Sequence, residues 1–147
     1  MSDNQKPSTE QQTMSVQEAL DLAVQHHTTG ELSLAEDIYQ QILQAHPDQP
    51  QALHLLGVIA HQKGENEKAV DLISKALTLQ PDYAEAHCNL GISYKELGRL
   101  DDAASSYRRA IEIKPDYAEA HNNLGNILRA LERLEDCLLY TSPSPRD

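Results

Sequence analysis

Apolar side chains recur along this chain in a pattern that repeats every 34 residues. Within each half of the repeat, leucine, isoleucine, alanine and tyrosine are spaced by three, four and seven residues, which places them on one face of an α-helix. In the clearest repeat, residues 84–117, the pattern predicts helices over 85–97 and 101–113. Each repeat is therefore expected to form two antiparallel helices.

Three prolines fix the register of the repeats. Pro47, Pro81 and Pro115 are each 34 residues apart, and the segments 81–91 and 115–125 are identical at ten of eleven places. Counting back from the prolines gives units that start at residues 16, 50, 84 and 118. Proline cannot continue a helix, so each one is expected to end the second helix of its unit.

All six glycines occupy two places in the unit. Gly57, Gly91 and Gly125 are eighth, where a small residue lets the second helix approach closely. Gly30, Gly64 and Gly98 are fifteenth, where glycine can adopt the left-handed conformation that ends a helix. The sequence Ser15-Val-Gln-Glu18 has the form of a capping box and predicts where the first helix begins.

These features predict an all-α protein, an α-solenoid of stacked helix hairpins, because one hairpin cannot bury its own apolar face. We expect a repeat domain over residues 15–136, with units 16–49, 50–83, 84–117 and an incomplete 118–136. Residues 1–14 are polar and are expected to form a disordered tail.

The repeat pattern breaks down at the end of the chain. Cys137 stands where alanine is expected, and two prolines fall where a second helix should continue. We therefore expect only a stub of the last second helix and a non-repeat tail over 137–147. The sequence CLLYTSPSPRD resembles translated sequencing-adaptor read-through, so one hypothesis is that these residues are not native and that the parent chain continues; the other is a natural polar tail.

Charge and composition exclude several functions. The net charge is −11, and residues 16–49 contain six carboxylates and no Lys or Arg, which disfavours nucleic acid and anionic membranes as partners. The two cysteines form no disulfide framework, which favours a cytosolic setting. Neither the seven histidines nor any nucleotide-binding or hydrolase motif forms a convincing site, so we expect no metal, cofactor or catalytic residue in this chain.

The repeats resemble the tetratricopeptide repeat (TPR). The resemblance covers about residues 16–136 and is carried by the Leu-Gly pairs ending at Gly57, Gly91 and Gly125, by Tyr94, and by alanines in the twentieth and twenty-seventh places. It implies a right-handed superhelix in which the first helix of each unit lines a concave face. The first unit is the most divergent, with Ala19 in the fourth place.

The resemblance also implies which residues face a ligand. Asn89 and Asn123 share the sixth place, and an asparagine in this place resembles the ladder that lines protein O-linked N-acetylglucosamine transferases; alternatively, it is only part of a common consensus. Asparagine both donates and accepts, so it can bind a peptide backbone. The other residues that we expect on the concave face are His54, His61, Lys95, Asn122, Asn126 and Arg129.

The functional expectation is a scaffold that binds a peptide or partner protein on its concave face. The alternative is the substrate-recognition segment of a truncated glycosyltransferase, with a sulfotransferase or methyltransferase parent also conceivable.

The carboxylate clamp of chaperone-binding repeats is disfavoured, because Leu20 and Val24 stand where it needs Lys and Asn. An incomplete last unit also predicts self-association.

Overall fold

The computed structural model describes residues 14–141, and all regular structure within that range is α-helical. The chain divides into two compact units, 1–47 and 48–147, which are described separately. The first unit contains α1 (Val16–Thr28) and α2 (Leu32–Ala45), and the second contains α3 (Pro50–Gln62), α4 (Asn66–Leu79), α5 (Ala84–Glu96), α6 (Leu100–Ile113) and α7 (Ala118–Thr141). Apart from Met14, the tail expected to be disordered lies outside the described residues.

The helix starts and ends follow the local chemistry that the sequence predicts. The Ser15 hydroxyl accepts a hydrogen bond from the Glu18 backbone N–H at 3.1 Å and begins α1. Gly30, Gly64 and Gly98 all have positive φ angles, of 84°, 81° and 77°. After each glycine, the next backbone N–H reaches five residues back to a carbonyl, which closes the helix end. The expected hairpin turns are confirmed.

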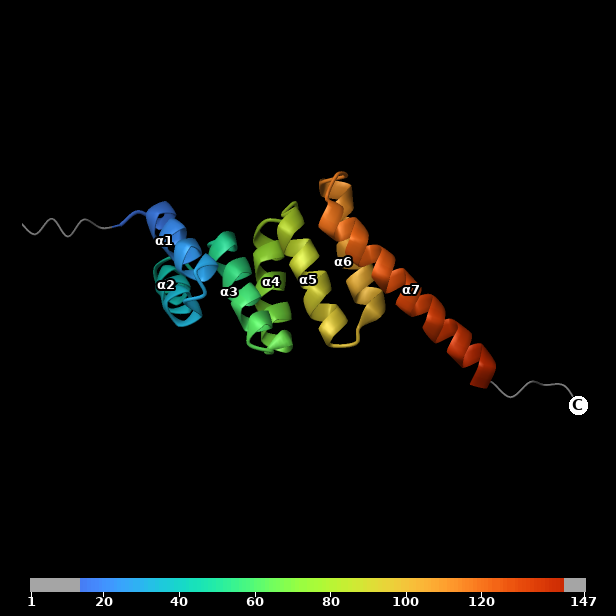
Figure 1. The fold of residues 1–147 in the computed structure, drawn as a ribbon. Coiled ribbons are helices and arrows are strands. Elements are labelled where there is room, and N and C mark those ends of the chain that lie inside the picture. Colours follow the sequence, from blue (N-terminus) through green and yellow to red (C-terminus); the bar gives the residue numbers. More distant parts are fainter. Residues whose placement is uncertain (1–13, 142–147) are drawn as a thin grey trace, which may run out of the picture. The chain divides into compact units, whose positions relative to one another are not determined.

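The helices of the second unit form adjacent antiparallel pairs. Helices α3 to α7 lie side by side in chain order in Figure 1, and each contacts the next. Two apolar clusters hold them together. One joins Ala69 and Ile73 of α4 to Ala86 and Leu90 of α5, and the other joins Tyr107 of α6 to residues of α5 and α7.

The glycines in the eighth place bring the helices of a pair into close contact. A methyl group added to Gly57 would lie 2.6 Å from Ile73 Cγ1, and one added to Gly91 would lie 2.6 Å from Tyr107 Cε1. A methyl group on Gly125 would meet nothing within 4 Å. Gly125 therefore lies on the corresponding face of α7, but among the described residues no following helix packs against that face.

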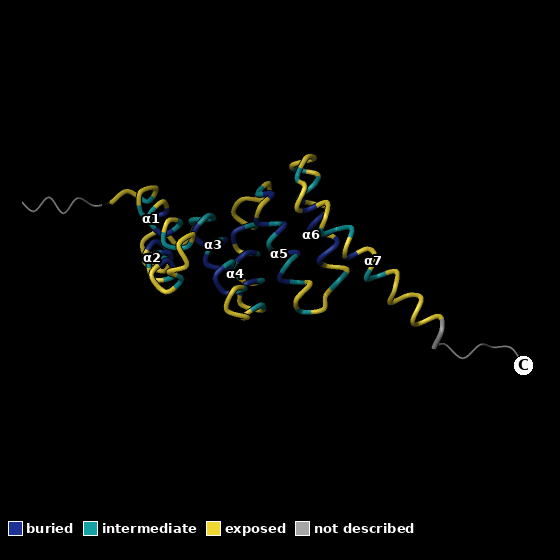
Figure 2. The backbone as a smooth tube through the Cα atoms, in the orientation of Figure 1, coloured by how far each residue is buried: buried dark blue, intermediate teal, exposed yellow. Residues whose placement is uncertain are grey.

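The prediction that the last unit ends in a stub of a second helix is wrong, because α7 continues as one helix to Thr141. Glu132 stands in the fifteenth place, where the other units have glycine, and it does not take the left-handed conformation that ends a helix. The far half of α7 is exposed, as Figure 2 shows in yellow, including Leu128, Leu134 and Leu138. Residues 142–147 lie outside the described residues.

Candidate functional site

A hydrogen-bonded group of three side chains joins α3 to α5 in the second unit. His54 Nδ1 lies 2.9 Å from the Tyr83 hydroxyl, and His54 Nε2 lies 2.7 Å from Asn89 Nδ2. The rings of His54 and Tyr83 also pack edge to face, with their centroids 4.7 Å apart. His54 is 3% exposed, so both of its nitrogens depend on these two partners.

The partners determine the protonation of His54. An amide nitrogen only donates, so Asn89 Nδ2 donates to Nε2, and the Nδ1–H of His54 donates to the Tyr83 oxygen. Burial lowers the pKa of His54 to about 4, which keeps the ring neutral at neutral pH. Burial also raises the pKa of Tyr83 to about 12, and the nearby charge of Glu85 adds to this shift.

The same arrangement recurs one unit later with different chemistry. Cys88 takes the place of His54, and Tyr117 and Asn123 take the places of Tyr83 and Asn89. Asn123 Nδ2 lies 4.0 Å from Cys88 Sγ, and Cys88 also hydrogen-bonds with Tyr117. Burial, with a smaller effect of Glu119, raises the pKa of the Cys88 thiol to about 11. Cys88 is therefore a neutral, buried thiol and a poor nucleophile.

These contacts correct part of the expected ligand-binding set. His54 was expected on the ligand-facing surface, but it is buried and both ring nitrogens are engaged, so it presents no polar group to a ligand. The physical reason is the tyrosine in the last place of the unit, which covers the ring. Tyr83 and Tyr117 are not among the site residues predicted from the sequence, although the repeated Pro-Asp-Tyr sequence is a signal for them.

The two asparagines are half-buried, and each is bonded on one side only. In the part of the chain that the structure describes, the side-chain nitrogen of each contacts the preceding unit, whereas no protein donor reaches either Oδ1. Each asparagine therefore keeps a carbonyl oxygen that can accept a hydrogen bond from a ligand. Their side chains are held in place before any ligand binds.

The remaining expected residues are closer to the surface. Asn122, Asn126, Lys95 and Arg129 are exposed, and His61 is half-buried. Arg129 Nη2 donates to Asn126 Oδ1 at 2.8 Å, and His61 Nδ1 lies 2.8 Å from Asn66 Oδ1. His61, Lys95 and Arg129 occupy the same twelfth place on α3, α5 and α7, so basic or titratable groups follow one another on successive helices.

Two histidines outside this set have structural partners. His87 Nε2 donates to the Pro81 carbonyl at 2.9 Å, and His121 Nε2 donates to the Pro115 carbonyl at 2.7 Å. Each histidine thus ties the first helix of a unit to the proline that precedes it. No group of three metal-ligating side chains occurs among the described residues.

Antiparallel helix pairs with the same contacts in successive 34-residue units define an all-α helical-repeat protein. Residues 59–98 and 93–131 match the family described as TPR repeat, and the chain belongs to the TPR repeat proteins. No curated protein matches the sequence. No helix in the range 14–141 has the length and apolar character needed to cross a membrane.

Solved TPR structures share this fold. The first TPR domain of Spaghetti (RPAP3), bound to the HSP90 peptide SRMEEVD, is 23% identical with a TM-score of 0.76, over 80% of this chain and 93% of that one. The Sgt2 TPR domain from Aspergillus fumigatus is 22% identical with a TM-score of 0.77, over 90% of this chain and 86% of that one. A Thermobaculum terrenum O-GlcNAc transferase mutant is 32% identical with a TM-score of 0.75, over 77% of this chain but 22% of that one.

Proposed function

We propose that this chain is a protein-binding module that holds an extended peptide, or an extended segment of a partner protein, along the first helices α3, α5 and α7. The observation that carries the proposal is the pair Asn89 and Asn123. They stand in the same place on successive helices, each is anchored through its nitrogen, and each keeps an accepting oxygen. Such a pair can bind two backbone N–H groups of an extended chain without requiring particular side chains.

The exposed side chains on the same helices favour a ligand with acidic residues. Lys95 and Arg129 are exposed in the twelfth place of their units, and Asn122 and Asn126 add donors and acceptors nearby on α7. A carboxylate of the ligand can pair with either cation. The RPAP3 domain, which shares the fold, is bound to a peptide that contains two glutamates and a final aspartate.

A peptide array with acidic and neutral sequences, including SRMEEVD, tests this proposal. We expect Lys95→Ala/Arg129→Ala to weaken binding of acidic peptides by about tenfold or more, as for the loss of charge-assisted hydrogen bonds. The matched control is Lys75→Ala/Arg108→Ala, which removes the same charge from exposed places on the second helices α4 and α6. An equal loss in both variants would show that net charge alone governs binding.

The asparagines are tested separately, because Asn89 also holds His54. We expect Asn89→Ala/Asn123→Ala to lose binding to acidic and neutral peptides alike, since backbone contacts do not depend on the ligand side chains. Far-UV circular dichroism checks that the variant remains folded. Undiminished peptide binding by the folded variant would remove the asparagines from the proposed site.

A second candidate is that the chain is the substrate-recognition segment of a glycosyltransferase. The 32% identity to the O-GlcNAc transferase favours it, although this chain spans only 22% of that protein. The test is the gene sequence downstream of the codon for Asp136. A nucleotide-sugar-binding domain there would support this candidate, whereas further repeats followed by a stop codon would favour a scaffold.

Self-association through α7 is a further part of the proposal. Gly125 lies open, and Leu128 beside it is 40% exposed, so α7 of a second copy can pack there in an antiparallel pair. We expect light scattering to show a dimer that Leu128→Glu reduces to a monomer. Leu79→Glu, at a leucine of similar exposure on α4, is the control and should leave the dimer intact.

A further inference from the structure

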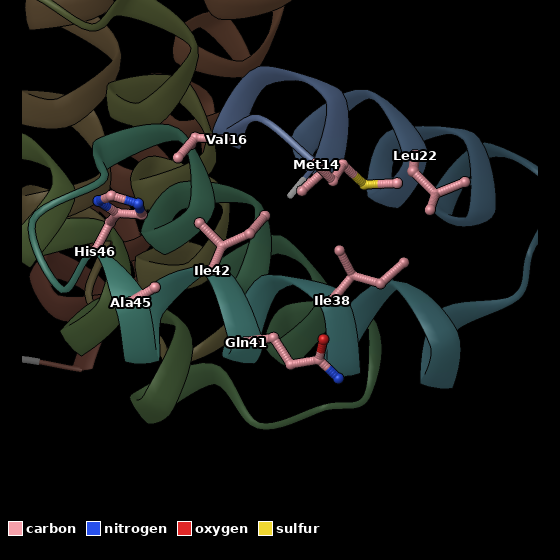
Figure 3. A pocket seen from close by; sticks show the side chains of 9 residues that line it. Met14, Val16, Leu22, Ile38, Gln41, Ile42, Ala45 and His46 are labelled. Atoms are coloured by element: carbon pink, nitrogen blue, oxygen red, sulfur yellow. The ribbon is translucent and has the colours of Figure 1, made fainter. Parts of the chain in front are cut away.

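The first hairpin carries an apolar groove. It lies between α1 and α2, has a volume of about 400 Å³, and is lined by Val16, Ala19 and Leu22 of α1 and by Ile38, Ile42 and Ala45 of α2 (Figure 3). A cavity of this size is within the range of about 300–1,000 Å³ that ligand sites occupy. All of its lining residues belong to the first unit.

In the third unit Leu90 takes the place of Leu22 and packs against Ile73 of the preceding helix α4, whereas no described helix precedes α1, so this face of the first hairpin is open. The fourth place of the first unit also holds a small residue, Ala19. In the second unit this place holds Leu53, which is buried. In the next two units it holds His87 and His121, whose rings reach the preceding proline carbonyls. Ala19 ends at its methyl group and so takes up less space in the groove than a leucine or a histidine would.

Helical spacing places two carboxylates beside this groove. Glu18 lies one helical turn before Leu22 on α1, and Asp37 lies one turn before Gln41, another lining residue, on α2; both carboxylates are exposed. Residues 16–49 contain no Lys or Arg that could neutralise them. An apolar groove with an acidic border is complementary to a ligand that is apolar on one face and basic on its flanks.

We propose that this groove binds an amphipathic, basic helix of a partner protein. A bulky apolar side chain of that helix fills the space beside Ala19, and its Lys or Arg residues pair with Glu18 and Asp37. This is the helix-in-groove mode of recognition, with apolar anchors at i, i+3, i+4 and i+7. The site is separate from the asparagine pair and uses different residues in a different unit.

The charge of the chain argues against a second copy as the occupant. None of the seven described helices has a positive net charge, and the first hairpin itself carries five carboxylates. Like charges facing one another across a groove oppose binding. The occupant is therefore a helix from a different, basic protein.

Fluorescence anisotropy of the full chain with a labelled Leu/Lys amphipathic peptide of about 18 residues, roughly five helical turns, tests the proposal. The decisive variant is Ala19→Leu, which restores the residue type of Leu53 and so fills the groove while keeping the repeat pattern. We expect it to weaken binding at least tenfold with no loss of thermal stability. Unchanged affinity for Ala19→Leu, or no binding of the peptide to the wild type, would overturn the proposal.

The charge contribution is tested with a matched pair of double variants. Glu18→Gln/Asp37→Asn should weaken binding several-fold and reduce its dependence on salt, since two ion pairs are lost. Glu67→Gln/Asp71→Asn makes the same charge change at exposed places on α4 and should leave the affinity unchanged. An equal effect of both variants, or equal affinity for a Leu/Glu peptide, would show general attraction to an acidic protein and overturn the proposal.

Discussion

His54 and Cys88 occupy the same place in successive units and are held by the same two kinds of neighbour, a tyrosine and an asparagine. The tyrosine and asparagine thus accept either an imidazole or a thiol, since both are small polar groups with a donor and an acceptor. The asparagine belongs to the next unit along the chain. At the scale of single residues, these side chains therefore link one repeat to the next.

The neutral state of His54 gives the first prediction. Its pKa in the folded chain, about 4, is below the usual value of 6.5, so the folded state favours the neutral ring. This contribution to stability is fully present above pH 6.5 and is lost as the pH falls toward 4. Between pH 7 and pH 5 we expect the free energy of unfolding to fall by about 2 kcal/mol on account of this histidine.

Urea unfolding at several pH values measures this effect. The control is His54→Gln, which cannot titrate in this range but keeps a polar side chain. We expect the wild type to lose about 2 kcal/mol more than the variant between pH 7 and pH 5. Parallel pH profiles for the two proteins would show that His54 is not the group responsible.

At the scale of helices, one place in the unit decides how closely a pair can pack. The eighth-place glycines of α3 and α5 are covered by Ile73 and Tyr107, whereas the corresponding glycine of α7 is open. The same residue type therefore has a packing role in two units and no described contact in the third. A substitution at these equivalent positions should have opposite effects.

We expect Gly91→Ala to destabilise the chain by about 1–3 kcal/mol, because its methyl group would lie 2.6 Å from the rigid ring of Tyr107. In the monomer, at concentrations too low for the dimer proposed above, Gly125→Ala should instead stabilise the chain by up to about 1 kcal/mol, because alanine favours a helix over glycine and the site is open. Thermal denaturation of the two variants checks both signs. A loss of stability in Gly125→Ala would indicate that another element covers this face.

Much of the fold could be predicted from the sequence, since the glycines, prolines and Ser15 act on the backbone close to where they stand. The repeat register does not predict the extension of α7, because Glu132 stands in the place where the other units have the glycine that ends the first helix. The burial of His54 is not predicted by the sequence for a different reason. It depends on Tyr83, 29 residues away, and a repeat register does not show which side chain covers which.

At the scale of the molecule, the two units differ in how much core each contains. Both apolar clusters of the second unit are built only from residues after Asp48. One connects α3, α4 and α5, and the other connects α5, α6 and α7. The first unit is a single hairpin of two short helices. Helices of this length are marginal in water by themselves, and a lone hairpin cannot bury its apolar face.

We therefore expect a fragment of residues 48–147 to keep its helical content and unfold cooperatively, and a fragment of residues 14–47 to be largely unfolded. Far-UV circular dichroism during thermal unfolding measures both, with the full chain as the reference. The longer fragment keeps Gln49, whose side chain accepts from the Gln51 backbone N–H at 3.3 Å and caps α3, so its first helix still has its natural start. If residues 48–147 were unfolded alone, the first hairpin would be part of the core that stabilises the repeats, and the division into two units would not describe their stability.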